Sequence, residues 1–246
     1  MDLDLPPMHL DLAFNAPLSP SRAGELAAFV TGSREGAHVV DVGCGWAELL
    51  LQAVAADPSV RGTGVDVDPV AIAHGRATAR ERGLEPRVTL VVGNGAVDAP
   101  ARADALVCIG ARQVWGDHDD ALAALRAMVP AGSRVVYGDG IWSRPPSPAA
   151  AAALGAEPDE YGPLVDLVDT AVRHGFRPLS VAEASQEEWD AFESGYGAGY
   201  ERWLLDNPPS HPHTGTVLQM ADDHRRAYLG GYRGVLGFAY LGMVAR

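Results

Sequence analysis

Acidic side chains surround the glycine-rich stretch Gly43-Cys44-Gly45, and their arrangement decides which ligand this bend suits. Asp41 stands just before the stretch, and Glu48 follows it. Glycines let the backbone turn sharply and leave no side chain to obstruct a ligand. A dinucleotide fingerprint requires glycine where Glu48 stands, and a carboxylate there would repel a pyrophosphate at the start of the next helix. The bend therefore favours a ligand that carries positive groups, such as an ammonium and a sulfonium.

A strand and a helix must position this bend. Val39, Val40 and Val42 form a β-branched run that is typical of a buried parallel strand, and apolar residues follow the bend with helical spacing. Strand, glycine bend and helix form the nucleotide cleft at the carboxyl edge of an open α/β sheet. An ordinary bend in another kind of α/β protein stays open at this point.

The pattern Asp41-x-Gly43-x-Gly45 resembles motif I of the class I S-adenosylmethionine (SAM) dependent methyltransferases. The chain departs from the family at Ala47, where a third glycine is common, and we expect this change only to tighten the bend. The resemblance implies a Rossmann-like methyltransferase fold. This is a doubly wound α/β fold with a seven-stranded, mostly parallel sheet, an antiparallel last strand and a helical insertion.

Asp66 ends a second expected strand, Gly62 to Asp66, roughly 20 residues after the bend, where an acid that grips a ribose is required. One carboxylate accepts hydrogen bonds from both vicinal hydroxyls, and charged acceptors make the stronger bonds. Gly64-Val65-Asp66 is similar to the family's acidic motif. Asp68, by contrast, precedes Pro69 and is expected to cap the next helix.

Asn94 follows a third expected strand, Val88 to Val92. The family commonly has an aspartate here that accepts a hydrogen bond from the adenine amino group, and an asparagine oxygen accepts such a bond too. Asn-Gly is also plain turn chemistry, so a structural role stays open. The resemblance implies these cofactor-binding residues: Asp41, Gly43, Cys44, Gly45, Asp66, Val67, Asn94, Gly95, Gly110 and Ala111.

Further elements agree with the family in order and spacing. Asp104 to Ile109 is a fourth strand, which the family places beside the first, so that its end borders the transferable methyl group. A helix from Ala121 to Met128 leads into Val129 to Arg134, which resembles the family's Pro-x-Gly turn. A fifth strand is expected over Arg134 to Tyr137, and a loop over residues 138–146. This agreement supports the methyltransferase interpretation more than any single motif does.

A base is required if the methyl acceptor is a hydroxyl or an amine. The sulfonium already makes the methyl group electrophilic, so the protein mainly aligns donor and acceptor. The predicted catalytic residues are Asp139, His118 and Tyr137, with Asp139 first because strand ends face the cleft. His9 and His224 are further candidates, and no histidine has a spacing that singles it out.

A long insertion separates a sixth strand, Arg177 to Val181, from a closing strand, Leu236 to Ala245. At about 50 residues it far exceeds a hairpin loop and predicts a substrate lid. Its aromatic residues recur at steps of three and four, as one helical stripe: Trp189, Phe192, Tyr196, Tyr200 and Trp203. Such a stripe more often packs the helix onto its domain, although Tyr and Trp also give a pocket polar tips. The predicted substrate-binding residues are His9, Phe14, Arg112, Gln113, Trp115, Trp142, Tyr196 and Tyr200.

The organisation expected from these elements is one methyltransferase domain over residues 1–246. Residues 1–31 form a cap segment with a helix that Ser21 caps and Thr31 ends, 32–184 the SAM-binding core, 185–232 the helical lid and 233–246 the closing strand. His9, Phe14 and Asn15 become lid residues if the first segment folds over the cofactor, as in the family. A frayed terminus is the alternative.

Composition narrows the partners. With 246 residues and 47% hydrophobic content the chain can bury a core, and its net charge of −13 argues against a nucleic-acid partner. Cys44 and Cys108 are a poor basis for disulfides, which favours a reducing compartment. No signal peptide and no apolar run of membrane length are found. We expect a cytoplasmic monomer or homodimer that acts on a small molecule, without membrane or metal, since His211-Pro212-His213 lacks further ligands.

The leading hypothesis is SAM-dependent methyl transfer to a small organic molecule in secondary metabolism. A SAM-binding enzyme that catalyses a non-methylating reaction on a small molecule is the alternative. A more remote alternative is an NAD-dependent oxidoreductase, which Glu48 disfavours. A binding module without catalysis is the weakest, because a lid over an acceptor has little use without turnover.

Overall fold

The computed structural model describes residues 12–32 and 34–246, and the chain divides into two compact units. The sheet unit comprises Ser19–Ile141, Pro163–Glu183 and Phe238–Arg246. The helical unit comprises Trp142–Gly162 and Ala184–Gly237, together with the described residues before Ser19. The segment expected as a lid thus lies within the helical unit.

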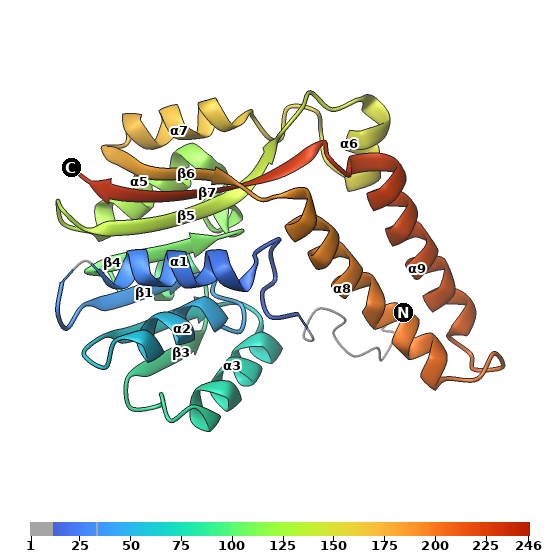
Figure 1. Ribbon diagram of the computed structural model, residues 1–246, viewed down its shortest axis with the longest axis horizontal. Helices are drawn as coiled ribbons and strands as arrows, with labels where there is room; N and C mark the ends of the chain where they lie inside the picture. Colours follow the sequence, from blue (N-terminus) through green and yellow to red (C-terminus); the bar gives the residue numbers. More distant parts are fainter. Residues whose placement is uncertain (1–11, 33) are drawn as a thin grey trace. The chain divides into compact units, whose positions relative to one another are not determined.

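Seven strands form one sheet in the order β3-β2-β1-β4-β5-β7-β6, and helices flank it (Figure 1). The strands are β1 His38–Val42, β2 Arg61–Asp66, β3 Val88–Val92, β4 Ala105–Ile109, β5 Arg134–Trp142, β6 Phe176–Glu183 and β7 Leu236–Ala245. The first five are parallel to their neighbours among themselves, whereas β6 and β7 pair antiparallel. The expected doubly wound, mostly parallel sheet is confirmed.

Helices connect the strands, with a 3₁₀ turn at Arg112–Val114. Those of the sheet unit are α1 Pro20–Thr31, α2 Glu48–Ala56, α3 Pro69–Glu81, α4 Gly95–Asp98, α5 His118–Met128 and α7 Leu164–Arg173. Those of the helical unit are α6 Pro148–Leu154, α8 Gln186–Asp206 and α9 Thr214–Ala227, followed by a π-helical turn, Tyr228–Tyr232. No helix in the described part of the chain has the length and apolar character that a membrane crossing requires.

The helix starts follow from local capping chemistry, with one correction. Asp68 caps α3 as expected, because its Oδ1 accepts a hydrogen bond from the Val70 amide at 2.8 Å. For α1 the expectation was wrong by two residues: the cap is Ser19, whose Oγ accepts from the Arg22 amide at 3.3 Å. Pro20 then occupies the first helical position, where its missing N–H costs nothing.

Strand β5 extends five residues beyond its expected end at Tyr137, so the loop expected over residues 138–146 begins only at Ser143. Its central place between β4 and β7 gives the backbone hydrogen-bonding neighbours on both sides. Gly138 contributes to this pairing, since a Cβ there would lie 2.9 Å from the Ala239 carbonyl oxygen of β7. Asp139 therefore lies inside a strand.

The core of the sheet unit lies between β4, β5, β6 and β7 and the helices α5 and α7. Its fully buried members include Leu106, Leu122, Val135, Phe176 and Met243. Each large apolar side chain of this kind stabilises the fold by about 1.5–3 kcal/mol when buried. This packing fixes the carboxyl ends of β4 and β5, from which the polar residues of the candidate site project.

In the helical unit, α8 and α9 run side by side (Figure 1). Tyr200 of α8 forms a small core with Val217 and Ala221 of α9, and Tyr196 and Trp203 pack against it. Part of the aromatic stripe thus packs α8 against the second inserted helix, an outcome the sequence did not distinguish from packing onto the sheet.

Candidate cofactor and catalytic site

The glycine bend between β1 and α2 combines a tight side with an open side. Gly43 and Gly45 have positive φ angles of 70° and 54°. A Cβ at Gly43 would lie 2.2 Å from the Ala111 Cβ, so no larger residue fits there without displacement. A Cβ at Gly45 would meet no atom of the described residues within 4 Å. The bend is therefore packed against the end of β4 on one side and accessible on the other.

Ala47 does more than tighten the bend, contrary to expectation. It adopts a left-handed conformation with φ at 62°, the one positive φ among the described non-glycine residues. This conformation costs an L-residue roughly 1–2 kcal/mol. Its amide donates to the Cys44 carbonyl at 2.7 Å, which closes the turn before α2 begins. The family's third glycine would relieve this strain, so the bend of this chain stores it.

Asp66 joins the end of β2 to the bend. Its Oδ2 accepts a hydrogen bond from the Gly45 amide at 2.7 Å, and its Oδ1 accepts from the Asp68 amide at 2.9 Å. A carboxylate has about four acceptor positions, so two further donors can still bind it. The structure thus brings the predicted ribose ligand and the predicted glycine bend together, and adds a backbone-holding role that the sequence did not reveal.

Asp41 is only 4% exposed, in the middle of the sheet where β1 pairs with β2 and β4. Within the described residues its carboxyl group makes no hydrogen bond. Burial, and then the charge of Asp66, raise the pKa of Asp41 to about 8. At pH 7 this carboxyl is mostly protonated, so the negative charge expected from Asp41 beside the bend is mostly absent.

Glu48 has a structural role that weakens one argument from the sequence. Its carboxylate accepts hydrogen bonds from both terminal nitrogens of Arg82, at 3.0 and 2.9 Å, and from Gln52 at 2.9 Å. A bidentate arginine neutralises most of its charge. The repulsion of a pyrophosphate by Glu48, expected from the sequence, is therefore smaller than that of an unpaired acid.

Residues predicted to contact the adenosyl group lie at the carboxyl ends of β2 and β3. The side-chain oxygen of Asn94 accepts from the Ala96 amide at 2.9 Å, so it caps α4 as its turn chemistry indicated. Gly95 packs closely, because a Cβ there would lie 2.4 Å from the Val42 Cγ1. Val67 is 69% exposed, which is unusual for valine and leaves its apolar side chain open to a ligand.

The end of β4 meets the bend through the contact of Ala111 with Gly43. Gly110 has a φ of 67°, which lets the chain leave the strand sharply. Burial raises the pKa of both cysteines of this region, Cys44 and Cys108, so both stay protonated near neutral pH. Cys44 is thus a small space-filling residue of the bend.

Asp139, the first candidate for a base, is buried within β5 and holds the turn that follows β4. Its Oδ2 accepts from the Arg112 amide at 3.1 Å, and its Oδ1 accepts from the Gly140 amide at 2.7 Å. The Arg112 Nε lies 3.6 Å from Oδ1. Burial raises the pKa of Asp139, while His118 and these donors oppose the rise.

His118 and Tyr137 form a pair beside Asp139. The Tyr137 hydroxyl lies 2.8 Å from His118 Nδ1, and the two rings meet edge to face with centroids 6.0 Å apart. Tyr137 is fully buried, and burial with the Asp139 charge raises its pKa. Burial lowers the pKa of His118, although Asp139 opposes this. The three predicted catalytic residues therefore come together with Arg112, and their catalytic roles stay predictions.

The predicted substrate residues of the sheet unit lie on the turn after β4. Gln113 is exposed and donates from Nε2 to the Gly110 carbonyl at 3.2 Å. Trp115 is half-buried against the main core. Arg112, held by Asp139, is the charged group of this turn. All three lie at the carboxyl edge of the sheet, close in sequence to the bend's partner Ala111.

The other predicted substrate residues belong to the helical unit, except His9, which lies outside the described residues. Trp142 is buried, donates from Nε1 to the Pro158 carbonyl at 3.0 Å and packs edge to face on Tyr161. Phe14 and Tyr200 are buried and Tyr196 is half-buried. Their roles in substrate binding stay predictions.

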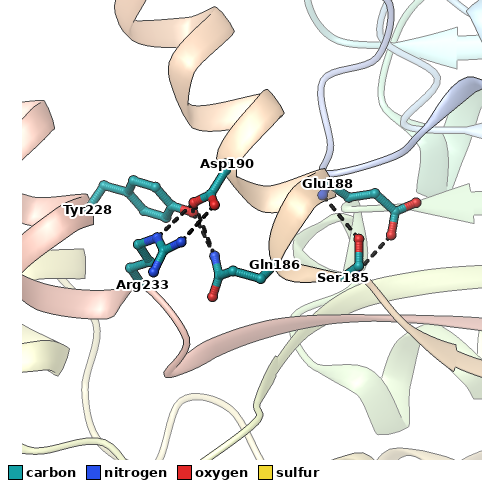
Figure 2. Close-up of polar contacts among 6 residues, drawn as sticks. All are labelled: Ser185, Gln186, Glu188, Asp190, Tyr228 and Arg233. Carbon is teal, nitrogen blue, oxygen red and sulfur yellow. Dashed lines mark hydrogen bonds and ion pairs between the residues drawn. The ribbon is translucent and has the colours of Figure 1, made fainter.

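Two polar clusters of the helical unit escaped the sequence analysis. One joins Glu193 and His224 with Tyr232, and the other joins Asp190 and Arg233 with Gln186 and Tyr228 (Figure 2). One local signal was readable: Ser185 and Glu188 form a capping box that starts α8, also drawn in Figure 2.

Comparison with known proteins defines the class. Residues 39–132 match the family model described as a methyltransferase domain. A SAM-dependent methyltransferase from Geobacter sulfurreducens, solved with S-adenosyl-L-homocysteine, superposes with a TM-score of 0.87 at 23% identity, over 99% of this chain and 100% of that chain. A second one, from Thiobacillus denitrificans with the same ligand, gives 0.86 at 22% identity over the same shares.

YjhP of Escherichia coli, an uncharacterized protein, is 28% identical over 178 residues, which are 71% of each chain. Its crystal structure superposes with a TM-score of 0.86 at 23% identity, over 98% of both chains. The fold is that of SAM-dependent methyltransferases of known structure, and residues 39–132 match a methyltransferase domain, as the resemblance in the sequence predicted. The matched residues 39–132 include the bend, Asp66 and the end of β4.

Proposed function

We propose that the sheet unit binds SAM and that the protein transfers its methyl group to a small organic molecule. The observation that carries this proposal is the Asp66 carboxylate, which is bonded to the Gly45 amide beside the open side of the bend. The match of residues 39–132 to a methyltransferase domain supports it. The two bacterial neighbours solved with S-adenosyl-L-homocysteine support the choice of cofactor.

The residues of the bend fit such a cofactor. Asp66 keeps acceptor positions for two ribose hydroxyls, and the exposed Val67 offers an apolar surface to a flat ring. The NH2 group of Asn94 remains a donor for a ring nitrogen, since only its oxygen is used in the cap. Asp41, buried below the bend, supplies a carboxyl that ionises most easily beside a positive ligand.

SAM, when bound, supplies a methyl group on a sulfonium, and the protein's residues must align the acceptor and remove its proton. We assign His118, Tyr137 and Asp139 to proton handling. His118 has a lowered pKa and is therefore a neutral base near pH 7, Tyr137 holds its Nδ1, and the Asp139 charge favours the imidazolium that forms. Asp139 also orients Arg112.

The acceptor class and setting are further proposals. A net charge of −13 disfavours nucleic acid as the acceptor, which supports a small organic molecule. We assign the reaction to secondary metabolism and the protein to the cytoplasm, as a monomer or a homodimer.

Isothermal titration of the full chain with SAM and with S-adenosylhomocysteine tests the cofactor. Asp66→Asn should weaken binding about tenfold or more, because a charged acceptor contributes roughly 1.5–3 kcal/mol. Asp68→Asn is the matched control, since asparagine caps α3 as well as aspartate does and the change lies two residues away. Absence of binding heat for the unchanged protein with both ligands would overturn the proposal.

Methyl-labelled SAM then tests the reaction. Incubation with a panel of small hydroxyl, amine, thiol and carbon acceptors should release S-adenosylhomocysteine in step with labelled product. His118→Asn should lower kcat with little change in SAM affinity, because it removes the base and leaves the bend intact.

A second function keeps the cofactor and omits the transfer. The [4+2]-cyclase SpnF superposes with a TM-score of 0.69 at 21% identity, over 91% of this chain and 80% of that chain. This likeness favours a non-methylating reaction as the runner-up. In that case a substrate would change structure while SAM is neither consumed nor converted to S-adenosylhomocysteine.

A further inference from the structure

A buried carboxyl group joins three elements inside the helical unit. Glu193 of α8 is 6% exposed. Its Oε1 accepts a hydrogen bond from the Tyr232 hydroxyl at 2.9 Å, and its Oε2 lies 3.1 Å from Nε2 of His224 on α9. Both oxygens thus have partners, one on the π-helical turn and one on α9. None of these three residues is among those assigned above to cofactor binding.

The imidazole of His224 is held in place by α8. It stacks on the Tyr196 ring with centroids 5.2 Å apart and an interplanar angle of 25°. A Cβ at Gly197 would lie 3.4 Å from the His224 Cδ2, so the glycine leaves the ring its space. The Tyr200 ring is tilted against it at 6.2 Å. Because the ring cannot easily turn away, its protonation state acts directly on Glu193.

The other groups that face the pair do not carry the response to pH. Tyr200, Tyr228 and Tyr232 are phenols whose pKa burial raises above the ordinary value, so they stay neutral near neutral pH. Helix α6, which packs against the π-helical turn and α9, consists of proline, alanine and leucine. Glu193 itself raises the pKa of His224 through their hydrogen bond, although burial opposes the rise.

We propose that the Glu193–His224 pair is a proton-dependent contact that closes α8 on α9 and loosens as His224 loses its proton. With His224 protonated, the buried carboxylate faces an opposite charge. After deprotonation it faces a neutral ring, and a buried carboxylate without a counter-charge is strongly unfavourable. The helical unit therefore senses pH independently of any methyl transfer.

The sign follows from linkage. A histidine whose pKa is higher in the folded state binds its proton more tightly there than in the unfolded chain. The stabilisation is complete below the ordinary histidine pKa of 6.5 and disappears as pH rises through the higher folded value. The pH range over which the stability changes therefore begins near neutral pH, where few other side chains titrate.

A matched control lies in the same unit. Asp190 of α8 accepts hydrogen bonds from Arg233 at 2.8 and 2.7 Å and from the Tyr228 hydroxyl at 2.6 Å (Figure 2). Arg233 lowers the pKa of Asp190, and Asp190 raises the pKa of Arg233. Both partners therefore keep their charges across the neutral range, so this Asp190–Arg233 pair joins similar elements without responding to pH.

Hydrogen exchange of the full chain, followed by mass spectrometry from about pH 6 to about pH 9 and corrected for intrinsic rates, tests the proposal. Protection of α8 and α9 peptides should fall by up to about tenfold per pH unit between the ordinary histidine value of 6.5 and the higher folded pKa of His224, and should level off above it. Glu193→Gln and His224→Gln should abolish this pH-dependent step. Asp190→Asn should lower protection at all pH values and keep the step.

An NMR titration supplies a readout that survives a partial loss of stability. The His224 ring protons should titrate above the ordinary histidine value in the unchanged protein and at a lower pH in Glu193→Gln. A flat corrected exchange profile in the unchanged protein, or a step that persists in His224→Gln, would overturn the proposal.

Discussion

Two buried carboxyl groups, one in each unit, differ in what the fold gives them. Asp41 in the sheet unit is 4% exposed and Glu193 in the helical unit is 6% exposed. Glu193 has a partner for each oxygen, Tyr232 and His224. Asp41 makes no hydrogen bond within the described residues and has Asp66, another acid, as its charged neighbour. The two carboxyl groups are thus similarly buried but differ in whether they have hydrogen-bond partners.

The difference separates architecture from function. A buried carboxylate with complete pairing holds elements together, whereas one without partners destabilises the fold. Proteins retain such destabilising groups mainly where activity requires them. The two groups also differ in where a proton is bound at neutral pH. Asp41 is itself protonated, whereas Glu193 favours a proton on its partner His224. The unpaired acid lies beside the glycine bend, which agrees with the proposed site.

The largest effect is expected from Asp41→Asn. The folded protein holds a proton on Asp41 up to about pH 8, whereas the unfolded chain releases it near 3.8. The free energy of unfolding therefore falls as pH rises between these values, and asparagine removes this loss. The variant should be more stable at pH 8 by an amount on the order of several kcal/mol, with the gain shrinking towards pH 4.

Urea denaturation at a series of pH values measures this gain in stability, and SAM titration measures the accompanying loss of affinity. If Asp41 ionises beside the positive ligand, the substitution should weaken the binding of SAM. It should weaken the binding of S-adenosylhomocysteine, whose sulfur is neutral, by a smaller factor. A variant with unaltered stability at pH 8 would contradict the unpaired state of Asp41.

The second effect is the reverse in sign. Glu193→Ala leaves the hydroxyl of Tyr232 and the ring of His224 without their acceptor. Removing one partner of a buried charged pair typically costs about 3–5 kcal/mol. A probe confined to the helical unit, such as exchange of α9 amides, should register the loss. The double variant with His224→Ala should lose less than the sum of the single variants, since the two residues are coupled.

The parts of the fold that the sequence predicted are those set by neighbouring residues. The valine run gave β1, the Asp68-Pro69 pair gave the start of α3, and Asp66 was found at the end of β2. The bounds of β7 were also predicted without error. Alternation, capping and glycine turns are local rules, so they can be read without the partner elements.

The missed features depend on partners distant in the sequence. Glu48 is neutralised by Arg82, 34 residues away in the sequence. Likewise, Nε2 of His224 lies 3.3 Å from the backbone carbonyl oxygen of Glu193, 31 residues away. Asp139 was expected in the loop that follows the fifth strand, but β7 packs against Gly138 and keeps the segment in the sheet. The proton on Asp41 likewise follows from burial between two strands, which no local pattern indicates.

The third effect compares the two glycines of the bend. Gly43→Ala combines a φ of 70° with a contact of 2.2 Å to the Ala111 Cβ. Strain and overpacking together should lower the free energy of unfolding by about 2–4 kcal/mol. Gly45→Ala has the positive φ without the contact, so it should cost only about 1 kcal/mol.

Chemical denaturation and SAM titration distinguish these two variants. Gly43→Ala should weaken SAM binding because it pushes the bend and the end of β4 apart. If Gly45→Ala instead weakens binding more than its small effect on stability implies, the open side of the bend is where the ligand lies, and the comparison of the two sides becomes sharper. Equal effects of both variants on stability would contradict the packing at Gly43.

The smallest effect is expected from Arg233→Gln, which removes the bidentate partner of Asp190. This pair is about two-fifths exposed on both sides, at 42% and 41%, so water and salt screen its attraction. Asp190 also retains its bonds to Tyr228 and Gln186. The unfolding midpoint should therefore shift slightly, and the shift should shrink as salt is added. A loss of stability as large as that of Glu193→Ala, and unchanged by salt, would contradict this expectation. It would mean that the exposed Asp190–Arg233 pair, rather than the buried Glu193 carboxyl, holds α8 to the end of the insertion. The contrast between the buried and the exposed paired acids would then fail.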